Sequence, residues 1–167
     1  CQEYEEDFTI LRFPIIEADV DSLKWSTSQY TVVNIGKVVQ HPDSAQESNI
    51  VYDRLVLTGF TNENDVEKLQ IVFDIADIDQ LAGIYTPEYS ELGRLVHAEW
   101  VTATLSEEST YATYSLCELE TAQLKIERQN RAEDIFSGSF SFTACQKNAA
   151  ENTLRFTNGK FRDLEYN

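Results

Sequence analysis

The sequence predicts an all-β protein, an antiparallel β-sandwich or partly closed barrel of about nine strands with little helix. Three observations favour this fold class. Apolar and polar residues alternate with a period of two near the C-terminus, Val, Ile, Thr and Tyr are concentrated in several earlier segments, and turn-prone runs separate these segments. No helical stripe of useful length is present, and the best short candidates are residues 65–69 and 77–81.

The clearest alternation lies in two neighbouring runs. In residues 136–144 the even positions are aromatic or small, and every odd position carries a hydroxyl group. Residues 122–127 also alternate, and the polar residues 129–133 separate the two runs. This pattern predicts a β-hairpin centred on Arg131, because a slip by one residue would turn the phenylalanines out to water. The predicted facing pairs are Ile126 with Phe136, Leu124 with Gly138, and Ala122 with Phe140.

Five earlier segments have the composition of strands with less regular alternation. They are rich in Val, Ile, Thr and Tyr, which favour extended backbone. Turn-prone runs lie between them, at spacings typical of sandwiches and barrels. The segments are residues 30–39, 50–60, 69–75, 94–105 and 110–117.

The dipeptide Asn158-Gly159 is a strong signal for a tight turn. It lies between the apolar residues Phe156 and Phe161. It predicts either a two-residue turn between two strands or a bulge within one last strand, in which Gly159 takes a positive φ. The two alternatives stay open at this point.

The chain has 167 residues, of which 42% are apolar, enough for one domain with a substantial core. We expect residues 8–167 to form a single all-β domain, and the acidic residues 1–7 to form an extended, solvated tether. The 13 basic and 29 acidic residues give a net charge of −16, so the chain repels phosphate backbones and nucleic acid is not an expected partner. No segment approaches the ~18 consecutive apolar residues of a membrane-spanning helix.

The first residue, Cys1, is followed by the acidic segment 2–7. This arrangement looks like the start of a mature bacterial lipoprotein, in which a thioether-linked diacylglycerol on the cysteine anchors the protein to a membrane. The chain contains no methionine, which fits a processed product. The alternative is that Cys1 is only the point at which a fragment begins.

Two blocks near the C-terminus carry a resemblance to a known family. Residues 136–144 followed by residues 154–161 resemble a family of Bacteroidetes lipoproteins of unknown function, in which an SGTFSFTA strand precedes a TNGKF ending. Residues 69–74 and 83–85 are similar to the strand and the Gly-x-Tyr element of that family. The resemblance implies an all-β lipoprotein domain at the outer membrane or cell surface, and it supplies no catalytic residues.

Cys117 and Cys145 are candidates for a disulfide. The hairpin register that buries the phenylalanines sets these residues opposite each other, at a Cα separation of ~4.5–5.5 Å that is within or near the range of a disulfide. An exported domain would meet the oxidising conditions that close the bridge. The alternative is that residues 118–120 form a turn that interrupts the pairing and leaves two free cysteines.

No motif of catalysis or metal binding stands out. The two histidines, His41 and His97, lie in distant segments, and His97 is expected on the solvent face of its strand. No Gly-x-Ser-x-Gly turn is present. We therefore predict no metal site and no cofactor. Calcium is an alternative, since several acidic or amide residues could supply oxygens, although none fits a calcium-loop motif. These residues are Asp19, Asp21, Asp74, Asp77, Asp79 and the turn 62–65.

Tyr85, Tyr89 and Trp100 are candidates for ligand-facing aromatic residues at the mouth of the sandwich or barrel. The competing interpretation is that Tyr and Trp side chains are cross-strand core partners, and it is the favoured one.

These observations favour a non-enzymatic lipoprotein domain, anchored to a membrane and with a binding or structural role at the cell envelope. A glycan or an envelope protein is the expected partner. The alternative function is a secreted carbohydrate-processing hydrolase, or a carbohydrate-binding accessory, with an acidic and aromatic cleft. A deep pocket with two carboxylates, one of them desolvated, would favour the hydrolase.

Overall fold

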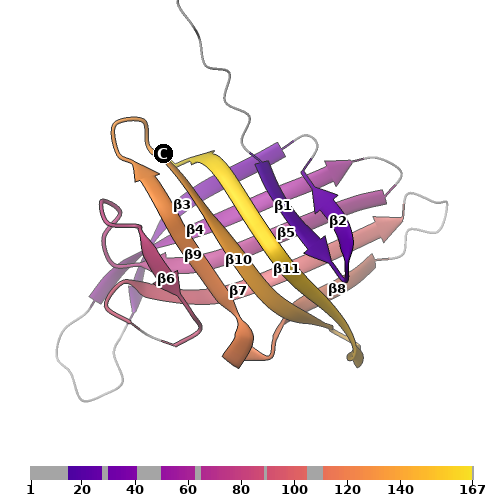
Figure 1. Ribbon diagram of the computed structural model, residues 1–167. Coiled ribbons are helices and arrows are strands. Elements are labelled where there is room, and N and C mark those ends of the chain that lie inside the picture. The colour runs from indigo at the N-terminus through magenta and orange to yellow at the C-terminus, as the bar shows by residue number, and fades with distance from the viewer. Residues whose placement is uncertain are drawn as a thin grey trace, which may run out of the picture.

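A computed structural model describes residues 15–27, 30–40, 50–62, 65–88, 90–104 and 111–166. These ranges hold eleven strands and one short 3₁₀ element, η1 (Leu119–Thr121) (Figure 1). The strands are β1 (Ile15–Val20), β2 (Leu23–Ser26), β3 (Tyr30–Gln40), β4 (Ile50–Asn62), β5 (Asp65–Ile75), β6 (Gly83–Tyr85), β7 (Gly93–Thr104), β8 (Tyr111–Cys117), β9 (Gln123–Asn130), β10 (Ile135–Gln146) and β11 (Ala149–Glu165).

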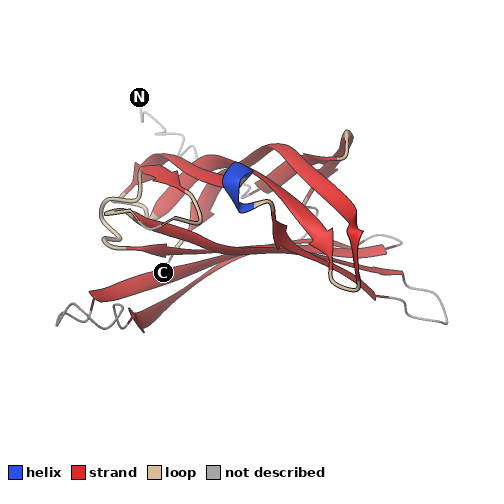
Figure 2. Ribbon diagram, turned by 90° about the horizontal axis from the view of Figure 1, so that it is seen from below, coloured by secondary structure: helices blue, strands red, loops and turns tan. Residues whose placement is uncertain are grey.

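The strands form one antiparallel sheet that curls into a half-barrel (Figure 2). Nine strands follow one another in the order β2-β1-β11-β10-β8-β7-β5-β4-β3, and β9 and β6 branch from β10. The predicted fold class, an all-β antiparallel sandwich or partly closed barrel with little helix, is confirmed. In the part of the chain that the structure describes, no helix is long and apolar enough to cross a membrane.

Strand β10 belongs to both walls of the half-barrel. It pairs with β11 along its whole length, from Ile135 to Gln146. Its other edge pairs with β9 over residues 135–141 and then with β8 over residues 143–146. The sheet therefore forks at β10 into a front layer (β2, β1, β11, β10, β9, β6) and a back layer (β8, β7, β5, β4, β3), which cross in Figure 1.

The core fills the space between the two layers. Trp25 of β2 packs edge-on against Trp100 of β7, with ring centroids 5.0 Å apart. Trp100 in turn contacts Phe156 at 5.3 Å, and Phe156 stacks on Phe142 at 4.5 Å. The Trp25 indole N–H donates to Thr61 Oγ1 of β4 at 2.7 Å, so its polar atom is also satisfied by the opposite layer. Aromatic packing thus joins front and back layers.

Glycines let two strands of the front layer pack closely. Gly138 of β10 pairs with Phe161 of β11, and Phe140 of β10 pairs with Gly159 of β11. In both pairs the phenylalanine ring lies where the Cβ of any other residue would be. Since the rings are buried, with Phe161 fully covered and Phe140 only 5% exposed, each glycine contributes the space that a core ring occupies.

The hairpin predicted around Arg131 is confirmed, but its register was wrong by two residues. Ile126 pairs with Gly138 and Leu124 with Phe140. The turn lies further along the chain, at residues 131–134, because Asp134 adopts a left-handed conformation with φ of 52°. A shift of two residues preserves the face of every side chain, so the predicted burial of the phenylalanines holds.

Of the two alternatives for Asn158-Gly159, the bulge is confirmed. β11 is one continuous strand, and the registers of β1 and β10 against it both shift next to this dipeptide. The positive φ belongs to Asn158, at 51°, not to Gly159 as expected. A second left-handed residue, Asp163, accompanies a further register shift near the end of β11. Asn and Asp tolerate this conformation better than other side chains.

The five earlier predicted strands are present as β3, β4, β5, β7 and β8. Residues 65–69, considered as a helix, form the start of β5, and residues 77–81 form a turn. The strands β1 and β2 were not predicted, because they are short and expose residues on both faces. The predicted tether, residues 1–7, and Cys1 lie outside the described residues.

Cys117 and Cys145 are joined by a disulfide, with their Cα atoms 5.8 Å apart. The predicted register does not explain the bridge, because β8 and not β9 reaches this end of β10. Cys117 pairs with Thr143 and Cys145 with Ser115, so the bridged residues are diagonal neighbours and not directly opposite. The bridge fastens β8 of the back layer to the strand that both layers share.

The glycine contacts predict a selective effect of added methyl groups. A Cβ at Gly138 would overlap the Lys125 carbonyl oxygen and the Phe161 ring, so Gly138→Ala should lower the free energy of unfolding by about 3 kcal/mol. Chemical denaturation measures this change. Gly36→Ala in β3 is the control, since no atom lies within 4 Å of its added Cβ. Equal losses in the two variants would contradict the proposed packing.

The disulfide predicts a linked peptide pair in a digest of the unreduced protein, which separates on reduction. Replacing both Cys117 and Cys145 by Ser releases a loop of sequence separation 28 in the unfolded chain and should cost about 3–4 kcal/mol of stability. Reduction of the wild-type protein should destabilise it similarly and leave the double variant unchanged. Two freely alkylated cysteines in the folded, unreduced protein would refute the bridge.

Candidate functional site

The aromatic residues proposed to face a ligand lie in the core, where the structure describes them. Tyr85 is fully buried, and its hydroxyl donates to the Leu81 carbonyl oxygen at 2.7 Å. Burial raises the pKa of Tyr85 to about 12. Trp100 is 3% exposed and packed between Trp25 and Phe156. The ligand-facing interpretation is therefore wrong for both residues. Tyr89 lies outside the described residues.

The carboxylates considered for calcium are dispersed over the molecule. Asp74, which is 1% exposed, accepts two hydrogen bonds from Arg54, at 2.8 Å and 3.1 Å, across β4 and β5. Asp19 accepts from the Asn158 side chain at 2.9 Å, and Asp21 from the Arg155 backbone N–H at 2.7 Å. Within the described ranges, no group of three His, Cys, Asp or Glu residues is placed to hold a metal ion.

The side chain of His97 lies toward solvent, as expected for its strand. Its exposed fraction is 40%, and its Nε2 lies 3.6 Å from a carboxylate oxygen of Glu99. The register between β5 and β7 shifts next to it, so Leu95, and not Val96, shares the buried side with Ala98. His41 lies outside the described residues.

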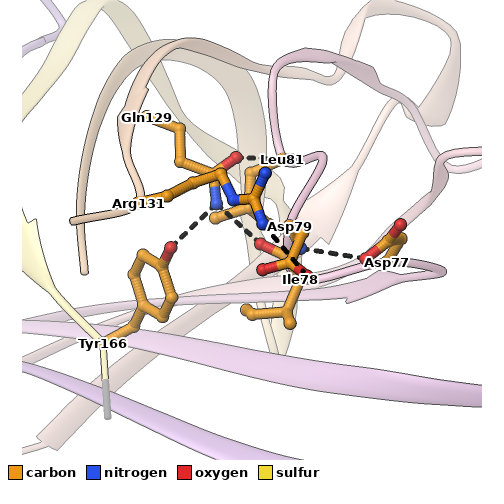
Figure 3. Close-up of polar contacts among 7 residues, drawn as sticks. All are labelled: Asp77, Ile78, Asp79, Leu81, Gln129, Arg131 and Tyr166. Atoms are coloured by element: carbon orange, nitrogen blue, oxygen red, sulfur yellow. Dashed lines mark hydrogen bonds and ion pairs between the residues drawn. The ribbon is translucent and has the colours of Figure 1, made fainter.

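A polar cluster closes one end of the half-barrel, where the β5–β6 connection meets β9 and the C-terminal residues (Figure 3). The Gln129 amide accepts from the Leu81 N–H at 2.9 Å and donates to the Ile78 carbonyl oxygen at 2.6 Å and to the Tyr166 hydroxyl at 2.8 Å. Arg131 approaches Asp79 at 3.5 Å. Every bond of Gln129 serves to hold the chain's own segments, so this cluster is a structural clamp.

The outward face of the front layer is the surface with the features of a binding site. Three grooves lie along it, and each lies beside a register shift of β11, β10 or β9. Their volumes are about 280, 320 and 500 Å³. A bulge bends its strand and disturbs the flat pleat, which explains why the hollows coincide with the shifts. Asn158 lines the first groove, Arg155 the second and Arg128 the third.

Cations and hydroxyl groups share this outward face. Strand pairing places Glu17, Lys160, Ser139 and Lys125 in one row across β1, β11, β10 and β9. Further exposed cations of the same layer are Lys24, Arg128, Arg155 and Arg162, and the other β10 hydroxyls are Ser137, Ser141 and the more buried Thr143. These residues offer hydrogen bonds and positive charge to a partner.

The sequence analysis did not single out this set. Its only signal was the hydroxyl at every odd position of residues 136–144, which was interpreted simply as a wet face. The lysines become neighbours of these hydroxyls through the pairing of β10 with both β9 and β11. The β1–β11 pairing, which adds Glu17 to the row, joins segments far apart in the sequence.

The clamp predicts a strong effect of removing one amide. Gln129→Ala leaves the Leu81 N–H and the Ile78 carbonyl without these partners and should lower the free energy of unfolding by about 2–4 kcal/mol. Hydrogen exchange of the Leu81 amide should accelerate more than that of core amides. Gln123→Ala, an exposed position of the same strand, should change stability by less than about 0.5 kcal/mol. An unchanged Leu81 amide in Gln129→Ala would contradict the clamp.

Comparison with known families gives one assignment. The model of a domain of unknown function (DUF6252) matches residues 44–164. The match includes strands β4 to β10 and nearly all of β11, and therefore the fork at β10 and most of the outward face of the front layer. Neither the curated proteins nor the solved structures give a match. Because the matched segment covers more than half of the sequence, this chain belongs to the DUF6252 family.

Proposed function

We propose that this chain is a lipid-anchored domain of the bacterial cell envelope, displayed at the outer membrane or cell surface, with a binding or structural role and no catalysis. The Cys117–Cys145 bridge is the observation that carries the proposal. Disulfides persist in oxidising compartments and are rare in the cytosol, so the bridge favours an exported protein.

The attachment residue in this proposal is Cys1. It is the third cysteine of the chain, and the bridge uses the other two. The acidic residues that follow it cannot pair with one another, which suits a solvated spacer between a membrane and a folded domain. The C-terminal blocks that resemble Bacteroidetes lipoproteins, residues 136–144 and 154–161, give the same expectation.

A binding role fits the shape of the front layer better than a hydrolytic one. The groove that contains two carboxylates, Glu17 and Asp19, is lined mainly by surface residues. Glu17 lies 3.5 Å from Arg162, and Asp19 accepts from Asn158. A hydrolase would need one desolvated acid beside a second carboxylate, and Asp74, the buried acid among the described residues, is held by Arg54 instead.

The anchor is tested by expressing the protein from its complete gene in a Gram-negative host and partitioning the lysate with the detergent Triton X-114. We expect the wild-type protein in the detergent phase and Cys1→Ser in the aqueous phase, because lipid chains supply the affinity for detergent. Protease added to intact cells measures surface display. The control Cys117→Ser/Cys145→Ser should keep the detergent phase. A wild-type protein in the aqueous phase would overturn the proposal.

A further inference from the structure

We propose that the outward face of the front layer binds an acidic polysaccharide whose sugars carry carboxylate groups. The face is defined by Lys24, Lys125, Arg155, Lys160 and Arg162 and by the hydroxyls of Ser137, Ser139 and Ser141. The inference rests on the proposed binding role and names the partner, but it does not depend on the lipid anchor.

The first argument is the difference in pairing between the acids and the cations of this face. Each acid already has a partner within the protein: Glu17 has Arg162, Asp19 has the Asn158 amide, Asp21 has the Arg155 N–H, and Glu127 has the Ser139 hydroxyl. The amino groups of Lys24, Lys125 and Lys160 form no hydrogen bond or ion pair with any residue that the structure describes. The unpaired charge on this face is therefore positive.

The second argument is the range of electrostatic forces. The chain carries a net charge of −16, which repels any anion at long distance. At physiological ionic strength, however, charges are screened over about 8 Å, while the two packed layers are about 10 Å apart. A bound anion on the outward face is therefore governed by the lysines and arginines beside it more than by the acids of the back layer.

The third argument is spacing. Lys160 and Lys125 are separated by Ser139 on the strand between them, so their backbones are about 10 Å apart at ~4.8 Å per strand. Such sparse cations suit a polymer with widely spaced charges. Duplex DNA, with one charge per about 1.7 Å, would suffer far more from the overall negative charge. The hydroxyl between the cations both donates and accepts hydrogen bonds, as recognition of sugar hydroxyls requires.

The probe is polygalacturonate, and the protein is the 167-residue chain with Cys1→Ser. We expect measurable binding in biolayer interferometry that weakens at least tenfold when NaCl rises from ~0.1 M to ~0.5 M, because charge pairs on a surface are screened. Neutral dextran should not bind. Lys125→Glu/Lys160→Glu should weaken binding at least about tenfold, while Lys125→Arg/Lys160→Arg should retain it.

The matched control is Lys68→Glu/Lys147→Glu, which changes the net charge equally at β5 and at the β10–β11 turn. It should change the affinity less than about threefold, and circular dichroism verifies the fold of each variant. Absence of polygalacturonate binding by the folded protein would overturn the inference. Equal loss in the two charge-reversal pairs, or binding only to phosphatidylglycerol vesicles, would do so as well. None of these outcomes bears on the Triton X-114 partition, which tests the anchor separately.

Discussion

The half-barrel depends on the shared strand β10, whose side chains must serve two layers at once. Its inward residues Phe136, Phe140 and Phe142 are at most 5% exposed, and Gly138 leaves room for Phe161 of the neighbouring strand. One edge of β10 is fully used by β11, and the other is divided between β9 and β8. The disulfide fastens the place where β8 takes over. Packing, strand pairing and the covalent link therefore converge on the same twelve-residue strand.

Much of this architecture is visible in the sequence, because a period of two is a local property. Residues 136–144 predict a strand with one buried face, and that face is the one observed. The register is less accessible, since a four-residue turn with Asp134 at positive φ moves every pair by two positions without changing a face. The fork is not local at all. Cys117 reaches Cys145 because β8 joins β10 beyond the end of β9, which the hairpin pattern alone does not reveal.

The candidate site was less predictable than the fold. Tyr85 and Trp100 are aromatic residues of the core, where burial of a large ring stabilises the protein, and composition does not separate such residues from a ligand platform. The cationic face arises instead from side chains of separate strands. Lys160 and Lys125 flank Ser139 only once β11, β10 and β9 are aligned. Bulges at Asn158 and Asp163 then add hollows to a face that a regular sheet would leave flat.

The central claim is that β10 is paired on both edges along nearly its whole length, and amide hydrogen exchange measured residue by residue tests it most directly. The account predicts that the backbone amides of β10, from Phe136 through Ala144, are among the slowest to exchange, with protection approaching the free energy of global unfolding. The short edge strand β2 should exchange much faster. Amides of β10 that exchange as fast as those of β2, or protection that stops where β9 ends, would contradict the shared strand.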